Sequence, residues 1–245
     1  MDIIGHRGFK RLYPENTMVG FKAASAFSID GIECDVHWTK DEVPVIIHDA
    51  ELERTTNGRG RVADHTWEEL QLLDAGSYFD KKFKGEKIPS LRELAQWLQE
   101  NNLTLHLELK EQLHTDNSNF VLSCISLLRE HSLIRRTIIS TFYHSYIREI
   151  KRQEPLLQTA LLTKTPFRRG KKYANKVAAD GIHIRHGVQA SMYYGPWRRQ
   201  GLTVRAYNVK RKQDYLRCLR AGVSGIITDD PEQMAELKFD RFVNS

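Results

Sequence analysis

The sequence predicts a closed (β/α)8 barrel, in which eight parallel strands each precede a helix. Three observations predict this fold. The chain has 245 residues, a length at which an α/β barrel is commonly a single domain. Strand-like and helix-like segments alternate from about residue 100 onward. No glycine-rich dinucleotide-binding sequence follows the first strand, which weakens the alternative of an open doubly wound sheet. We therefore expect residues 1–245 to form one barrel domain.

The eight strands are predicted where apolar residues alternate with polar ones or form short apolar runs. They cover residues 2–6, 32–37, 103–110, 137–142, 157–163, 181–185, 202–209 and 225–229. The clearest lies at 103–110, where leucines occupy one face and His106, Glu108 and Lys110 the other. This alternation predicts a strand with one face toward a core and one toward polar surroundings.

The second strand carries two carboxylates on one face. Ile32, Cys34 and Val36 alternate with polar residues, so Glu33 and Asp35 point the same way. Their attachment points are about 7 Å apart, which is two strand rises. Two carboxylates this close repel each other unless a cation lies between them. The alternative interpretation is the solvated polar face of an edge strand.

An insertion of about residues 39–88 follows this strand. Residues 43–49 form another strand pattern, but the linker is too short for a parallel crossover, so this segment must fold back as an antiparallel arm. The arm carries His48 back toward Asp35. Residues 50–88 are polar and glycine-containing, with a weak helix at 67–73. Long structured loops of this kind usually carry function or cover a site.

Capping signals and apolar spacing predict the helices. Asn16 or Thr17 can cap a first helix, and Ser90 with Glu93 forms a capping box that opens another. Asp230 is expected to cap the last helix, with a proline at its first position. The remaining helices are predicted at 118–131, 144–153, 171–179, 189–200 and 212–221.

Composition limits the possible partners and location. The formal net charge of +6 comes from short scattered clusters such as 168–169, 171–172 and 210–212. No long basic run with interleaved aromatics occurs, so we expect no nucleic-acid partner, and the clusters are interpreted as solvated faces. The three cysteines are far apart in sequence and suggest a reducing compartment. The first residues lack a signal-peptide pattern, and no apolar run approaches about 20 residues. We expect a cytoplasmic protein without stable membrane insertion.

The ionisable residues gather at the carboxyl ends of the predicted strands, where barrel enzymes form their active sites. These residues are His6 and Arg7, Glu33 and Asp35, Glu108 and Lys110, with His48 on the returning arm. Three converging carboxylates suit one hard divalent cation, Mg²⁺ or Ca²⁺. Two histidines beside a cation and two basic groups suit acid–base chemistry on a phosphoester. Each residue alone would more often be structural; the clustering favours a site.

An ordered set of short motifs spans the chain. It comprises His6-Arg7-Gly8, Pro14-Glu15-Asn16-Thr17, Glu33-x-Asp35-Val36, Thr39-Lys40-Asp41, His48-Asp49, Glu108-x-Lys110 and Gly225 to Pro231. The series resembles the glycerophosphodiester phosphodiesterase family. That family has a TIM-barrel fold with an insertion after the second strand. It hydrolyses glycerophosphodiesters to sn-glycerol 3-phosphate and an alcohol, using a divalent cation.

The resemblance implies roles for the matching residues. Glu33, Asp35 and Glu108 would bind the cation, and His6 and His48 would be the acid–base pair. Arg7 and Lys110 would hold the phosphate. Where the family typically carries a tryptophan followed shortly by asparagine, this chain has Tyr207 and Asn208, and Tyr207 can offer its ring to the glycerol.

Several alternatives remain open at this stage. A related barrel enzyme could act on lysophospholipids or another phosphodiester, and a non-catalytic barrel is a third hypothesis. The attacking group could be the glycerol 2-hydroxyl, giving a cyclic phosphate, or water. His183 and Arg185 lie on one face of their strand and could approach the site, but we favour a polar network inside the barrel as their role. His106 is expected to be structural, and Lys210 to point into solvent.

Overall fold

The predicted barrel is confirmed in the computed structural model, which describes residues 1–112 and 117–243. Its eight parallel strands are β1 (Asp2–His6), β2 (Gly31–Trp38), β4 (Thr104–Leu109), β5 (Thr137–Thr141), β6 (Gln158–Thr163), β7 (Gly181–Arg185), β8 (Thr203–Tyr207) and β9 (Gly225–Thr228). Strand β1 pairs in parallel with both β9 and β2, and this closes the sheet on itself. Because every strand runs in the same direction, all eight carboxyl ends meet at one mouth.

The chain folds back after β2, as the short linker predicts. Strand β3 (Pro44–Ile46) pairs antiparallel to β2, with Val36 opposite Ile46. The next residue, Ile47, donates a backbone hydrogen bond to the Asp35 carbonyl. His48 is therefore held beside the carboxyl end of β2. Strand β2 itself lies between β1 and β4 and is buried along its whole length. The interpretation of Glu33 and Asp35 as a solvated edge-strand face is therefore wrong.

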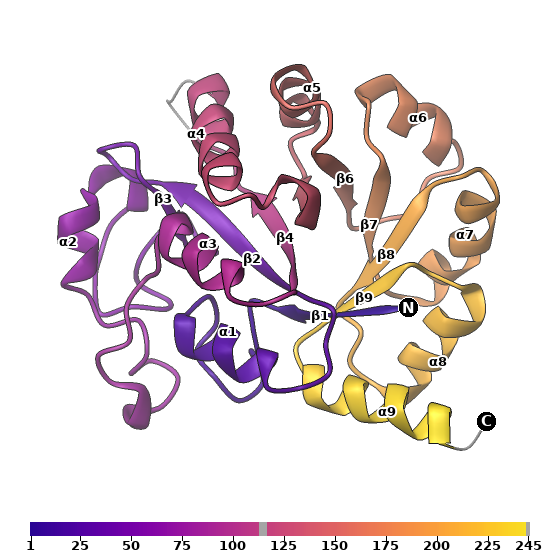
Figure 1. The fold of residues 1–245 in the computed structure, drawn as a ribbon, viewed down its shortest axis with the longest axis horizontal. Coiled ribbons are helices and arrows are strands. Elements are labelled where there is room, and N and C mark those ends of the chain that lie inside the picture. Colours follow the sequence, from indigo (N-terminus) through magenta and orange to yellow (C-terminus); the bar gives the residue numbers. More distant parts are fainter. Residues whose placement is uncertain (113–116, 244–245) are drawn as a thin grey trace.

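Helices surround the strands (Figure 1). They are α1 (Met18–Ser25), α2 (Trp67–Gln71), α3 (Leu91–Gln99), α4 (Asn117–Glu130), α5 (His144–Gln153), α6 (Gly170–Val177), α7 (Val188–Arg199), α8 (Lys212–Ala221) and α9 (Pro231–Val243). The predicted caps form: Ser90 and Glu93 complete a capping box, and Asp230 accepts from the Gln233 amide. Of the two candidates for α1, Thr17 is the cap, since its hydroxyl accepts from the Gly20 amide.

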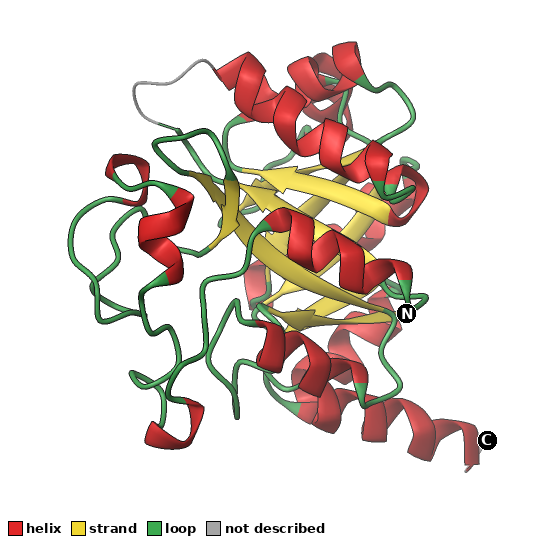
Figure 2. Cartoon of the chain, turned by 60° about the vertical axis from the view of Figure 1, so that its left-hand side comes forward, coloured by secondary structure: helices red, strands yellow, loops and turns green. Residues whose placement is uncertain are grey.

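Apolar side chains pack mainly between strands and helices. One cluster joins β2 and β4 to α1, α3 and α4, and a second joins β7, β8 and β9 to α6, α7 and α8. The insertion has a small core of its own, made by Val45, Ile47, Leu52, Val62, Leu70, Ala75 and Ile88. This core explains how a segment with so many polar residues keeps a defined shape. Figure 2 shows the insertion beside the ends toward which the strand arrows point.

Candidate active site

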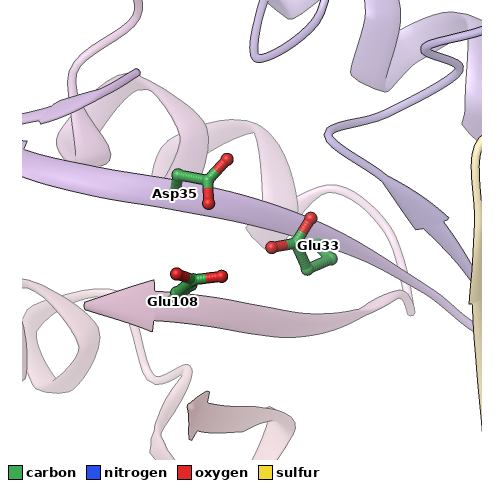
Figure 3. A group of neighbouring side chains, drawn as sticks. All are labelled: Glu33, Asp35 and Glu108. Carbon is green, nitrogen blue, oxygen red and sulfur yellow. The ribbon is translucent and has the colours of Figure 1, made fainter. Parts of the chain in front are cut away.

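Three carboxylates meet at the mouth of the barrel. Glu33 and Asp35 extend from β2 and Glu108 from β4, where Asp35 and Glu108 are register partners. One oxygen from each side chain lies within 4.8 Å of the others, and all three residues are buried. Figure 3 shows the three side chains as neighbours, with Glu33 and Asp35 on β2 and Glu108 on β4. The sequence alternation thus places Glu33 and Asp35 on one face, as predicted.

Burial and mutual repulsion set the charges of this trio. Burial, together with the Asp35 and Glu108 charges, raises the pKa of Glu33 well above its usual value. Burial and the charge of Asp35 raise the pKa of Glu108 to about 7. Burial opposes ionisation of Asp35 too, but Lys110 and Arg7 outweigh it, and the pKa of Asp35 falls well below its usual range. Carboxylates that repel each other in this way fit a divalent cation, which would favour their charged forms.

Two basic side chains lie against the same carboxylates. The Lys110 ammonium is 2.8 Å from an Asp35 oxygen and also contacts Glu108. The Arg7 Nε is 3.0 Å from the other Asp35 oxygen. The acidic partners raise the pKa of both groups, although burial opposes this, so both remain cationic. The site therefore offers fixed positive charge to an anionic group next to the carboxylate trio.

The backbone at Arg7 adopts an uncommon conformation. Its φ angle is +53°, in the left-handed region, which costs a residue other than glycine of the order of 1 kcal/mol or more. The turn directs the Arg7 amide to a Glu33 oxygen at 3.0 Å and the guanidinium to Glu15 at 2.7 Å. These two contacts and the contact of the Arg7 Nε with Asp35 offset the strain and fix the arginine at the mouth.

Each candidate histidine is paired with a carboxylate. His6 Nδ1 lies 2.5 Å from Asp229, at the end of β9, and His48 Nδ1 lies 2.5 Å from its neighbour Asp49. A carboxylate at Nδ1 favours the tautomer with its proton there, leaving Nε2 as the nitrogen able to exchange a proton. His6 Nε2 is 3.9 Å from Glu33, so this nitrogen faces the trio. Burial lowers the pKa of both imidazoles, and the carboxylates partly oppose the decrease.

The sequence predicted no role in the site for several residues that support these groups. Asn16 donates from its side-chain amide to Asp35 at 2.9 Å. Glu15 accepts from Arg7 and from Arg54, each at 2.7 Å, and Asp229 accepts from His6. Asn16, Glu15 and Asp229 all belong to motifs of the ordered series, and this membership was the signal that could have indicated a role in the site. Their partners lie elsewhere in the sequence, up to 223 positions away for Asp229, so the contacts require the closed barrel.

Two adjoining cavities open at the site. The inner one, of about 260 Å³, is lined by both candidate histidines, Arg7, Lys110 and Tyr207. The outer one, of about 830 Å³, extends from His48 and Lys110 toward the insertion and the aromatic pair Phe142 and Tyr143. Seven of the eight predicted site residues, all except Asp35, therefore surround a space large enough for a small phosphodiester, with room beyond it.

The remaining sequence predictions have different outcomes. His183 and Arg185 line the inner cavity, as does Tyr207, whose hydroxyl donates to the Thr163 carbonyl at 3.2 Å. His183 packs on His106, with ring centroids 5.7 Å apart, but neither His183 nitrogen has a hydrogen-bond partner among the described residues, so the predicted polar network does not form through it there.

His106 is 1% exposed and does not line the inner cavity, which agrees with the expectation that this residue is structural. Lys210 is largely in solvent as predicted, although its ammonium also lies 3.7 Å from Asp229.

Comparison with known proteins agrees with the fold and with the family resemblance. Residues 6–233 match the glycerophosphoryl diester phosphodiesterase family, and the chain belongs to this family of barrel hydrolases. It is 37% identical over 242 residues to the glycerophosphodiester phosphodiesterase of Caldanaerobacter subterraneus subsp. tengcongensis, covering 96% of each chain. A Bacillus altitudinis glycerophosphodiester phosphodiesterase is 31% identical, with 96% of this chain and 97% of the relative covered.

Solved structures give the same fold. The Agrobacterium tumefaciens glycerophosphodiester phosphodiesterase has a TM-score of 0.82 at 26% identity and covers 96% of this chain and 99% of its own. An Oleispira antarctica phosphodiesterase, solved with the product sn-glycerol-3-phosphate, has a TM-score of 0.90 at 24% identity. The match covers 100% of this chain and 97% of the Oleispira chain. The resemblance inferred from the motif series is confirmed by the family match and these relatives.

Proposed function

We propose that this protein hydrolyses glycerophosphodiesters to sn-glycerol 3-phosphate and an alcohol. The observation that carries the proposal is the placement of the carboxylate trio, two cationic side chains and two carboxylate-paired histidines around one cavity. Membership of the family and the 37% identical relative, itself named a glycerophosphodiester phosphodiesterase, support the reaction class. The substrate is a small molecule, and the inner cavity of about 260 Å³ is of the size of its glycerophosphate part.

Glu33, Asp35 and Glu108 would hold one divalent cation, Mg²⁺ or Ca²⁺, through carboxylate oxygens. When bound, such a cation neutralises phosphate charge and acts as a Lewis acid. Lys110 lies 2.8 Å from Asp35 and next to Glu108, so its ammonium would be able to turn toward the substrate once the carboxylates engage a cation. It would then face the phosphate as a point charge, while Arg7 offers a planar guanidinium.

The two histidines would move the protons. One Nε2 accepts a proton from the attacking hydroxyl and the other donates a proton to the leaving alkoxide. Asp229 and Asp49 hold the opposite nitrogens and fix both rings. The attacker is either the glycerol 2-hydroxyl, through a cyclic phosphate, or water. Tyr207 would line the glycerol part, since its ring belongs to the inner cavity.

The second candidate function is release of lysophospholipid headgroups by the same chemistry. The exposed aromatic side chains Phe142 and Tyr143 at the outer cavity favour it, because an acyl chain needs an apolar path. The acidic and basic residues of that cavity, Glu51, Arg61 and Glu111, favour a small polar alcohol instead. We therefore place glycerophosphodiesters first.

One panel tests the proposal. The purified protein is assayed on glycerophosphocholine and on lysophosphatidylcholine, before and after chelator, and again after Mg²⁺ or Ca²⁺ is restored. We expect metal-dependent release of sn-glycerol 3-phosphate from the first substrate. Turnover of the lysolipid alone would favour the second candidate. No turnover of either with any cation would contradict both and leave the non-catalytic barrel.

Leaving-group acidity separates the histidine roles. His6→Ala and His48→Ala should each lose about 10²–10⁴-fold in rate, as expected for a general acid or base. A diester with a nitrophenolate leaving group needs little protonation, so it should rescue only the variant that lacks the acid. His65→Ala, which changes an imidazole of the insertion outside both cavities, is the matched control. Near-normal rates in both site variants would disprove the paired-histidine mechanism.

A further inference from the structure

Three consecutive connections at the mouth of the barrel are strongly basic. They run from the ends of β6, β7 and β8 into the first turns of α6, α7 and α8, and cover residues 164–172, 185–192 and 208–213. We call these residues the basic rim. It contains nine lysines and arginines and no aspartate or glutamate: Lys164, Arg168, Arg169, Lys171, Lys172, Arg185, Lys210, Arg211 and Lys212. In sequence these charges form short separate clusters; in the barrel they belong to neighbouring loops.

Contacts tie the three loops into one surface. Strand β7 pairs with β6 on one side and β8 on the other, and helices α6, α7 and α8 follow one another around the barrel (Figure 1). The Phe167 and Trp197 rings join the first loop to α7, with centroids 5.5 Å apart. His186, after β7, lies 3.3 Å from Asp214 on α8. The rim is thus a continuous, supported edge of the mouth.

Most charges of the rim have no carboxylate partner. Within the described residues, Arg211 pairs with Asp214 and Lys210 lies 3.7 Å from Asp229. Arg168, Arg169, Lys172 and Lys212 are exposed and form no ion pair within 4 Å there. Lys171, Lys172 and Lys212 also lie in the first turns of α6 and α8, where the helix dipole is already positive. The unpaired cations and the helix termini both add positive charge, so the rim concentrates positive charge at one edge of the barrel.

Large apolar side chains stand among these charges. Val188 and Met192 are 70% and 71% exposed and lie one turn apart on α7, so they share a face. Phe142 and Tyr143, on the adjacent connection after β5, are 37% and 36% exposed. Cations beside exposed aliphatic and aromatic groups at one edge match the surface of an anionic bilayer, with charged headgroups above an apolar layer.

We infer that the basic rim docks the protein on the surface of an anionic phospholipid bilayer, with the mouth of the barrel turned toward it. A soluble polyanion would use the cations but would leave Val188 and Met192 uncovered. The inference goes beyond the proposed reaction and does not depend on it. If that reaction holds, docking places the enzyme where phospholipid deacylation, the class of reaction that yields glycerophosphodiesters, releases them.

Vesicle sedimentation tests the inference. The full chain is mixed with vesicles of phosphatidylcholine alone or with a large fraction of phosphatidylglycerol, at low and high salt. We expect binding to the anionic vesicles at low salt, weakened at high salt because the charges are screened. A variant with R168Q, R169Q, K172Q and K212Q should bind on the order of 10²–10³-fold more weakly, since each cation near the membrane contributes roughly five-fold.

A matched variant tests whether vesicle binding depends on the charges of the rim or on the net charge of the protein. K22Q, K176Q, R199Q and R220Q remove the same charge from exposed positions in the last turns of α1, α6, α7 and α8, away from the mouth. It should bind like the unchanged protein. A third variant, V188S with M192S, should bind several-fold more weakly at both salt concentrations. The circular dichroism spectrum and melting temperature of each variant check that the barrel is folded.

Two outcomes would overturn the inference. One is equal binding of the rim variant and the matched variant, which would mean that net charge alone acts. The other is binding of inorganic polyphosphate by the unchanged protein without binding of anionic vesicles, which would identify a soluble polyanion as the partner. Neither outcome bears on hydrolysis of the soluble substrate, so the proposed function stands or falls separately.

Discussion

At the scale of single residues, the site depends on charges that come from opposite ends of the chain. His6 ends the first strand and Asp229 follows the last, and they meet only because β1 pairs with β9. Burial lowers the pKa of His6, and the hydrogen bond and charge of Asp229 oppose that decrease. The carboxylate therefore both orients the ring and keeps it more basic than burial alone would allow.

Asp229→Asn should accordingly impair His6 without removing it. We expect a loss of about 10–100-fold in kcat, typical of a group that orients a functional imidazole. The limb of the pH profile that reports His6 should move to lower pH, because Asp229 no longer raises the pKa of the ring. Asp230→Asn is the control, since Asp230 contacts Arg11 rather than His6 and asparagine is an equally good helix cap.

A double variant gives a sharper version of this test. If Asp229 acts only through the imidazole, adding Asp229→Asn to His6→Ala should cost nothing further, since coupled residues are not additive. Full additivity of the two losses would contradict the pairing. The expected readout is kcat and kcat/KM on one soluble diester across the pH range.

His183 provides a pH-dependent term in stability. Burial and the nearby Arg205 lower the pKa of His183 to about 3 in the folded protein, against about 6.5 in the unfolded chain. Between these values the unfolded chain binds the extra proton, so this residue reduces stability as pH falls below 6.5. The free energy of unfolding falls between pH 7.5 and pH 5.0, and for His183→Asn this fall should be about 2 kcal/mol smaller than for the original protein. Urea unfolding at both pH values measures the difference, with His65→Asn as control.

At the scale of elements, the sequence predicts strands and caps well because these signals are local. Leucine alternation at 103–110 becomes β4 at Thr104–Leu109, and the Ser90 and Glu93 pair forms the box that opens α3. The choice between Asn16 and Thr17 as the cap of α1 could not be made locally, because Asn16 is engaged by Asp35 from another element. Asn16 also has a positive φ of 56°, unlike the extended backbone of the Thr17 cap.

The insertion is the element expected to govern the alcohol. Beyond His48 and Asp49, five residues of its 50–88 segment line the outer cavity and do not line the inner one: Ala50, Glu51, Arg61, Val62 and Ala63. Arg61→Gln should thus change KM across different headgroups by more than it changes kcat for a small activated diester. Arg59→Gln, two positions away and outside the outer cavity, is the control. A uniform decrease in kcat for every substrate would show instead that the insertion positions His48.

At the scale of the whole molecule, barrel closure assembles what the sequence spreads out. The predicted ligands, histidines and basic residues were found because they lie on strands or just after them, and local sequence patterns predict strands. The basic rim was missed because 164–172 and 208–213 look like ordinary solvated clusters until β6, β7 and β8 are placed side by side.

In the described parts of the chain no helix is long and apolar enough to cross a bilayer. That the barrel and its insertion form one domain stays a prediction, and a single unfolding transition would support it.

The carboxylate trio makes a last prediction about the molecule as a whole. Three buried carboxylates within 4.8 Å destabilise the fold without a cation, so Ca²⁺ or Mg²⁺ should raise the melting temperature. At about 100 times Kd the gain is about 2.7 kcal/mol, or roughly 5–10 °C for a chain of this size. The gain should shrink as pH falls, because protons compete with the cation for Glu33 and Glu108. Glu33→Gln should lose most of the cation-dependent shift, while Glu100→Gln, a surface change beyond the end of α3, should keep it. Equal shifts in the two variants would place the cation elsewhere.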